Sequence, residues 1–157
     1  MPQRRDVLGT LAIASASLLA GCTAPGWGSS HAKLVDLVVA NQRSESSTIG
    51  VRLRNTETET LVKDYRVELE AAEETPQTGQ LLDCDWPFRD PLVATATLLG
   101  DGGEVVDTHE IDTREVDSEC LNITFYADRD ERILATTGTD ACDQRVMANY
   151  VDSCEQT

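Results

Sequence analysis

The residues of this chain that could do acid–base or metal chemistry are few. Histidine is the usual general base and a common zinc or copper ligand, and the chain has only His31 and His109. His109 falls in a predicted strand without a nucleophile elbow nearby, so we expect a strand residue rather than a member of a Ser/His/Asp triad. A cupredoxin-type copper centre needs two histidines with a cysteine. We therefore expect a protein that is not an enzyme, with no catalytic residue, no bound metal and no cofactor.

Three carboxylates lie close together in the sequence, at Asp128, Asp130 and Glu131. Such a group could hold calcium, but an EF-hand loop also needs a glycine and a terminal glutamate at fixed spacing, and both are missing. A charged hairpin tip between two strands is the better interpretation.

The five cysteines divide into Cys22 and four in the rest of the chain. An even number in an exported chain predicts two disulfides, with three ways to pair them. Free buried thiols and a zinc site are the alternatives, although no two of these cysteines have the close spacing of a zinc knuckle. The four are Cys84, Cys120, Cys142 and Cys154.

The first 22 residues combine paired arginines with a short apolar run and a cysteine. Arg4 and Arg5 precede Val7–Ala20, a run of 14 mostly apolar or small residues, and Leu19-Ala20-Gly21-Cys22 closes it. A helix needs roughly 20 apolar residues to span a bilayer, whereas the apolar part of an export signal needs about 7–15. The length predicts a signal rather than a permanent span.

This segment resembles a twin-arginine export signal that ends in a lipobox. Gln3 and Val7 depart from the residues that the twin-arginine pattern favours, so the Sec route stays open as the alternative. The resemblance implies that residues 1–21 are a signal peptide, that cleavage precedes Cys22, and that the Cys22 thiol is lipidated. We expect a protein held by this lipid at the extracellular face of the cell membrane. The alternative interpretation is an ordinary secretory signal in which Cys22 is incidental.

The rest of the chain is strongly acidic. Without the signal, 27 acidic and 11 basic residues remain, a net charge of about −16. Such a chain repels nucleic acid, so no nucleic-acid partner is expected. Lys33 and Lys63 are its only lysines, and this composition resembles that of proteins from halophilic archaea. In molar salt the Debye length is about 3 Å, so repulsion between the carboxylates is screened.

Residues 22–32 are rich in Gly, Pro and Ser and have no apolar periodicity, which predicts a flexible tether. Residues 33–157 form the expected single domain. Its apolar residues alternate with polar ones, as in half-buried strands, and turn signals separate the runs. About seven strands without helical spacers predict an antiparallel, Ig-like β-sandwich. The expected strands are 34–40, 49–54, 65–70, 92–99, 104–111, 121–126 and 132–137.

One long connection holds Trp86, Phe88 and Arg89 close together. Loops often carry binding residues, and tryptophan with arginine is a common interface pair, so these three residues are candidates for binding a protein or carbohydrate. The alternative is that Trp86 and Phe88 fold back to close the open end of the sandwich. An exposed Trp86 would indicate binding, and a buried one would indicate a structural role.

Asn122 begins an Asn-Ile-Thr sequon. Alternation places its side chain on the face opposite Leu121 and Ile123, so Asn122 is a candidate site for glycosylation.

The C-terminal cysteines have helical spacing. Cys142, Val146, Tyr150 and Cys154 would share one face of a short helix, in which the two cysteines lie about 18 Å apart, too far to pair. We therefore expect Cys84 and Cys120 each to bond to one of them. If seven strands alternate in direction, these two disulfides lie at the end of the domain opposite the tether. The alternative is that these C-terminal residues form a short extended tail instead of a helix.

The sequence therefore predicts a lipid-anchored cell-surface protein of a salt-adapted organism, acting as a non-catalytic structural or binding module. The alternative is a ligand-binding or enzyme-accessory lipoprotein that presents the Trp86 loop.

Overall fold

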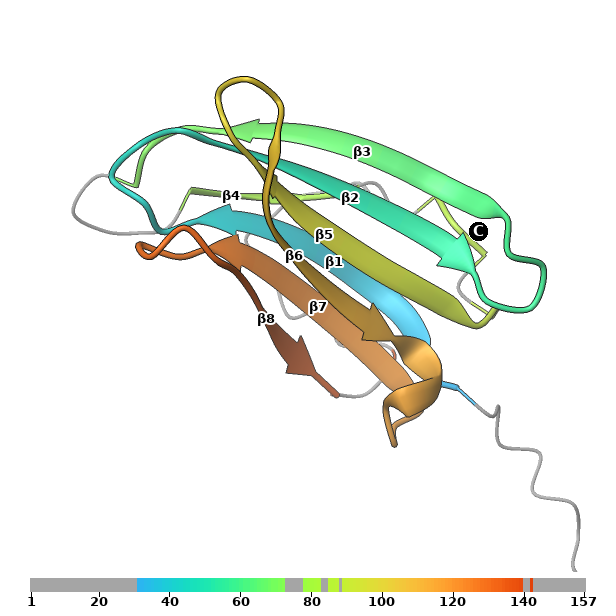
Figure 1. The fold of residues 1–157 in the computed structure, drawn as a ribbon. Coiled ribbons are helices and arrows are strands. Elements are labelled where there is room, and N and C mark those ends of the chain that lie inside the picture. Colours follow the sequence, from blue (N-terminus) through green and yellow to red (C-terminus); the bar gives the residue numbers. More distant parts are fainter. Residues whose placement is uncertain (1–30, 73–77, 83–84, 88, 140–141, 143–157) are drawn as a thin grey trace, which may run out of the picture.

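In the part of the chain that the structure describes, eight strands form two four-stranded sheets that pack against each other as a β-sandwich (Figure 1). The computed structural model describes residues 31–72, 78–82, 85–87, 89–139 and 142. One sheet has the strand order β4-β1-β7-β8 and the other β3-β2-β5-β6. The elements are β1 (Lys33–Asn41), β2 (Ser47–Asn55), β3 (Leu61–Leu69), β4 (Thr78–Leu81), β5 (Leu92–Leu99), β6 (Val105–Asp112), the 3-10 turn η1 (Thr113–Glu115), β7 (Cys120–Ala127) and β8 (Ile133–Gly138).

Alternation along the strands builds the core, as the sequence predicted. Successive side chains of a strand point to opposite faces, and in β2 the residues Ile49, Val51 and Leu53 are fully buried while Arg52 and Arg54 are exposed. The same pattern holds in β5, whose inward residues are fully buried. The inward residues of both sheets form one hydrophobic core, with Phe125 its largest fully buried side chain. The predicted sandwich is confirmed.

The strand that the sequence analysis missed is β4. It has four residues, includes Gly79, and pairs antiparallel with β1. Because β4 lies between β3 and β5 in the chain, it reverses the direction of every later strand relative to the prediction. As a result β7 runs parallel to β1, with Lys33 opposite Cys120.

The direction of β7 shows that the predicted location of the disulfides to the C-terminal cysteines was wrong. The first residues of β1 and β7 lie side by side, and Figure 1 shows both strands beginning near η1. We call this the tether end, because β1 follows residues 22–32. Cys120 is therefore at the tether end, not at the opposite end. The opposite end, which we call the distal end, carries the connections between β1 and β2, β5 and β6, and β7 and β8.

No helix among the described residues is both long enough and apolar enough to cross a membrane.

Candidate functional site at the two ends of the sandwich

Trp86 closes the tether end of the core. Its side chain is only 6% exposed, and it belongs to the hydrophobic cluster formed by both sheets. The indole Nε1 donates a hydrogen bond to the carbonyl oxygen of Leu34 at 2.9 Å, which satisfies the one polar group of the buried ring. Trp86 is therefore a structural side chain here, and it does not present an aromatic surface to a ligand.

The neighbours of Trp86 are held to the same end. Phe88 lies outside the described residues. Arg89 is exposed, and its backbone carbonyl accepts a hydrogen bond from His31 Nε2 at 2.7 Å. Lys63 donates to Asp85 at 2.7 Å, and this hydrogen bond, with the ammonium charge, lowers the pKa of the exposed Asp85 carboxyl.

Polar contacts fasten the end of this connection to two other segments. Asn55 Nδ2 donates to Asp90 Oδ2 at 2.9 Å. The hydroxyl of Thr113, which is fully buried, accepts a hydrogen bond from the Leu92 amide at 3.0 Å. The Thr113 carbonyl accepts another from the amide of Ala32 at 2.9 Å. The connection before β5 is thus tied to the end of β2 and to η1, and η1 is tied in turn to the residue before β1.

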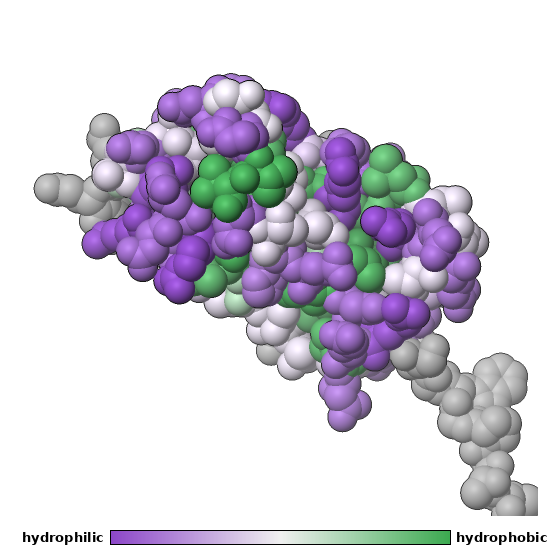
Figure 2. Space-filling view, viewed as in Figure 1, coloured by the Kyte–Doolittle hydropathy of each residue, from purple (hydrophilic) through white to green (hydrophobic). Residues whose placement is uncertain are grey.

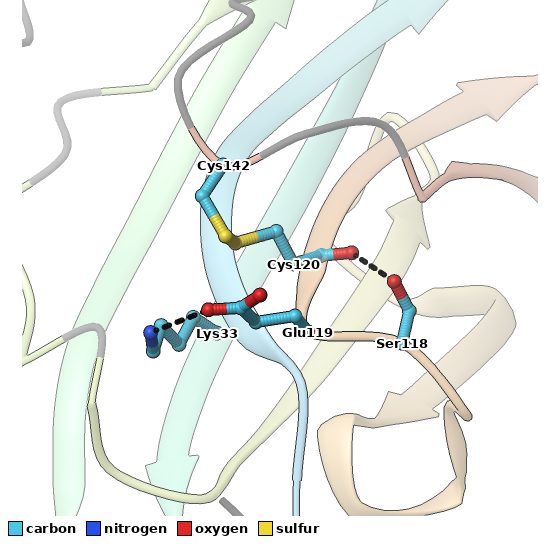
Figure 3. Close-up of a disulfide and its surroundings, with 5 residues drawn as sticks. All are labelled: Lys33, Ser118, Glu119, Cys120 and Cys142. Carbon is cyan, nitrogen blue, oxygen red and sulfur yellow. Dashed lines mark hydrogen bonds and ion pairs between the residues drawn. A yellow bond between two sulfur atoms is a disulfide. The ribbon is translucent and has the colours of Figure 1, made fainter. Parts of the chain in front are cut away.

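A disulfide joins Cys120 to Cys142 at the tether end, with a Cα–Cα distance of 5.3 Å (Figure 3). Beside it, Lys33 Nζ lies 3.3 Å from Glu119 Oε1, and the Ser118 hydroxyl donates to the Cys120 carbonyl at 3.0 Å. The bond agrees with the expectation that Cys120 pairs with a C-terminal cysteine, although at the other end of the domain. Closing a loop of this length stabilises a fold by about 3 kcal/mol.

Several other sequence expectations concern residues outside the described part of the chain. These are the signal peptide of residues 1–21, the lipidation of Cys22, most of the tether of residues 22–32, the pairing of Cys84 and of Cys154, and the helix after residue 139. They stay predictions.

His109 lies on β6 as a half-buried strand residue. Its ring packs edge-on against Phe125 of β7, with ring centroids 6.2 Å apart. Within the described ranges, no hydroxyl or carboxylate makes a hydrogen bond with this imidazole, and no three metal-binding side chains gather at one place. His109 thus serves the packing between the two sheets.

Asp128 organises the turn between β7 and β8. The residue is buried, with an exposed fraction of 7%. Oδ1 accepts hydrogen bonds from the amides of Asp130 and Arg132 at 2.9 Å, and Oδ2 accepts from the Arg132 guanidinium at 2.6 Å. Desolvation would raise the pKa of Asp128, but these hydrogen bonds outweigh it, so the pKa lies below its ordinary value. The acidic group is a hairpin tip held by its own arginine.

A groove of about 450 Å³ lies at the distal end, where the β1–β2 and β7–β8 connections meet. Arg43 Nη2 lies 3.4 Å from a Glu45 carboxylate oxygen and 3.2 Å from one of Glu131, so this arginine links the two connections. Arg129 is exposed, and no described residue forms a hydrogen bond or ion pair with it. The residues lining the groove are Gln42, Arg43, Ser44, Glu45, Ala72, Arg129 and Glu131.

The sequence analysis did not find this groove. Its residues come from connections that are distant in the chain, and only the antiparallel return of β8 and the parallel course of β7 bring them together. The one available signal was the presence of two arginines in the turns of a very acidic chain.

Asn122 faces outward, as the alternation predicted, but only 8% of it is exposed. Its Oδ1 is buried, and no described residue donates a hydrogen bond to it. Glycosylation of Asn122 stays a prediction, and a glycan would have to be attached before this side chain is buried.

Comparison with known proteins does not place the chain in a family. No family model matches it, and no curated protein does. Among solved structures, it is similar to a protein from Eubacterium rectale solved by NMR, with 11% sequence identity and a TM-score of 0.39 over 69% of this chain and 92% of that one.

Proposed function

We propose that this chain is a lipid-anchored domain at the extracellular face of the cell membrane of a salt-adapted organism, and that it acts as a non-catalytic structural or binding module. The observation that supports the proposal best is the difference between the two ends of the sandwich. The tether end holds Trp86, the Cys120–Cys142 disulfide and the start of β1. The distal end holds turns and the charged groove.

This difference between the two ends suits a domain attached through Cys22. The lipid and the tether lead to the first residue of β1, so the tether end faces the membrane. The nine residues of β1 span roughly 30 Å at about 3.3 Å each. The distal groove is thereby held away from the lipid surface, where a protein or carbohydrate partner can reach Arg129. A guanidinium donates several hydrogen bonds in a fixed plane, which suits a carboxylate on such a partner.

The structure gives less support to a module that presents Trp86. The indole is buried and lies at the end that would face the membrane. We therefore propose the distal end as the exposed functional end.

Antibody staining of intact cells tests the surface display. A short epitope inserted between Asp101 and Gly102, in the exposed turn between β5 and β6, should be stained on unbroken cells because this turn is at the distal end. The same epitope on a cytoplasmic protein serves as the control and should be stained only after lysis. Staining of the inserted epitope only after lysis would contradict the proposed location.

Salt dependence tests the proposed adaptation. The view in Figure 2 shows a mostly hydrophilic surface with small hydrophobic patches, and the exported part of the chain carries a net charge of about −16. Lowering the salt from molar to about 0.1 M lengthens the Debye length from about 3 Å to about 10 Å. The self-repulsion of the carboxylates then grows, so the melting temperature measured by circular dichroism should fall.

A charge variant separates repulsion from the general effect of salt on apolar burial. Glu57 and Glu68 are exposed, and the double variant Glu57→Lys/Glu68→Lys makes the net charge less negative by four. We expect a smaller loss of melting temperature in this variant than in the wild-type chain. Equal losses in both proteins, or a melting temperature independent of salt, would count against the adaptation.

A further inference from the structure

A buried polar side chain fixes each of the two connections that form the distal groove. In the connection between β1 and β2, this residue is Asn41, which is fully buried. Its Oδ1 accepts hydrogen bonds from the Arg43 amide and the Ser47 hydroxyl at 3.0 Å, and its Nδ2 donates to the Glu45 carbonyl at 2.8 Å. Asp128 holds the connection between β7 and β8 in a similar way. Because both backbones are fixed, the side chains that they carry into the groove are pre-organised for a ligand.

Each connection supplies one arginine to the groove, and neither arginine has a close carboxylate partner. Arg43 Nη2 is shared between Glu45 at 3.4 Å and Glu131 at 3.2 Å, and the side chains of these two acids are 77% and 67% exposed. Such exposed ion pairs are individually weak. Within the described part of the chain, Arg129 forms neither an ion pair nor a hydrogen bond. Two guanidiniums therefore keep donors for a ligand in a chain with a net charge of −15.

Glu131 has a backbone conformation that disfavours any residue with a side chain. Its φ is 57°, in the left-handed region that glycine adopts without penalty. Glycine at this position would relieve the backbone but would remove the carboxylate that contacts Arg43 from the opposite connection. Backbone strain of this kind is common at functional sites. We infer that Glu131 is there to orient the Arg43 guanidinium.

The lining of the groove suits charged side chains better than a buried small molecule. Small-molecule pockets are lined mainly by apolar and aromatic residues, whereas Ala72 is the one apolar residue among the described lining residues. The planar fork of a guanidinium matches a carboxylate. An acidic protein surface, such as the one that this chain itself has, presents many carboxylates. The chemistry of the groove therefore favours the acidic side chains of another protein.

We propose that the distal groove binds Asp or Glu side chains of an acidic protein partner, with one carboxylate on Arg129 and another in place of Glu45 on Arg43. Glu45 is the contact that gives way, because its distance to Arg43 is the longer of the two and its side chain is the more exposed. Glu131 stays on Arg43 and keeps it oriented. This inference rests on the proposed binding role of the distal end, and it adds the class of partner and an internal competitor for it.

Titration of detergent-extracted full-length protein with oligoglutamate in molar KCl tests the two arginines, with calorimetry as the measurement. Arg43→Gln and Arg129→Gln should each weaken binding about 10-fold. The matched control is Arg54→Gln, which removes the same charge from an exposed position at the tether end of β2 and should change binding less than about 2-fold. Melting curves check that each variant is folded, and Arg129 lies on an exposed turn where its replacement should not unfold the domain. No binding by the wild-type chain, or arginine variants that bind as well as the control, would overturn the proposal.

The variant Glu45→Gln tests the displacement. It keeps the shape of the side chain but removes the carboxylate that competes for Arg43, so oligoglutamate should bind about 2- to 5-fold more tightly, as expected for the loss of one exposed ion pair. Glu57→Gln makes the same change of charge in the exposed turn between β2 and β3, at the tether end, and should bind like the wild-type chain. An equal gain in both variants would mean that overall charge, not displacement of Glu45, controls binding.

Oligogalacturonate, which carries its carboxylates on a sugar chain, is the second probe. If it binds more tightly than oligoglutamate at equal carboxylate concentration, and with the same dependence on Arg43 and Arg129, the protein partner is wrong and an acidic polysaccharide takes its place. Epitope staining of intact cells tests the proposed location separately. Staining without oligoglutamate binding would overturn this inference alone, whereas binding without staining would overturn the location and leave the chemistry of the groove in place.

Discussion

Replacing Trp86 with alanine should lower the free energy of unfolding by about 3–5 kcal/mol, as is typical for removing a large buried aromatic side chain. The ring is 6% exposed and belongs to the core cluster at the tether end. Its removal leaves a cavity beside the start of β1 and leaves the Leu34 carbonyl without its donor. Urea unfolding in molar salt, followed by circular dichroism, measures the loss.

Trp86→Phe is the matched control for this prediction. Phenylalanine keeps most of the buried apolar area but cannot donate to the Leu34 carbonyl, so we expect a smaller loss, about 1–3 kcal/mol. If Trp86 were instead a surface anchor, both variants would unfold like the wild-type chain. In a Trp27→Phe background, which removes the only other tryptophan, iodide would also quench an exposed Trp86, whereas a buried one should resist quenching.

The strands were predictable from the sequence because period-two alternation reports directly on one buried face. The ranges found for β2, β5 and β7 differ from the expected ones by two residues or fewer at either end. The strand β4 was not predictable in this way. It is a short edge strand of the sequence Thr-Gly-Gln-Leu, and backbone pairing with β1 holds it rather than an apolar face. Missing this one strand reversed the predicted direction of all the later ones.

The predicted sites show a similar limit. The pattern of Trp86 near Arg89 is equally compatible with a binding loop and a plug, because the deciding contact is with the backbone of Leu34, 52 residues earlier. Alternation placed Asn122 on the outward face correctly, but periodicity within a strand says nothing about whether another segment covers that face. The burial of Asp36 and Asn122 is a tertiary property.

The same topology relates the proposed anchor to the proposed functional end. Because β1 and β7 run parallel and start together, the tether, the disulfide and the plug formed by Trp86 share one end of the domain. A pull on the tether therefore acts on strands that the Cys120–Cys142 bond and the Trp86 contacts hold in place. The loops of the distal end are not held by these contacts. The groove beside Arg129 lies at this end, where a partner could reach it.

Changing Cys22 to serine should release the protein from the membrane into the medium. A serine hydroxyl does not replace the thiol that the lipobox resemblance assigns for lipidation, and each buried methylene of a lipid chain contributes about 0.8 kcal/mol to membrane binding. The apolar run Val7–Ala20 precedes the expected cleavage site and is too short for a stable span.

Cell fractionation measures the release, with the wild-type chain expected in the membrane pellet and Cys22→Ser in the culture supernatant. The released variant must also be folded, so its melting curve in molar salt and its Cys120–Cys142 bond should match those of detergent-extracted wild-type protein. A second control, Ser29→Ala in the tether, keeps the thiol and should stay in the pellet. A folded Cys22→Ser variant that stays in the pellet after carbonate washing would mean that a segment other than the lipid holds this domain at the membrane.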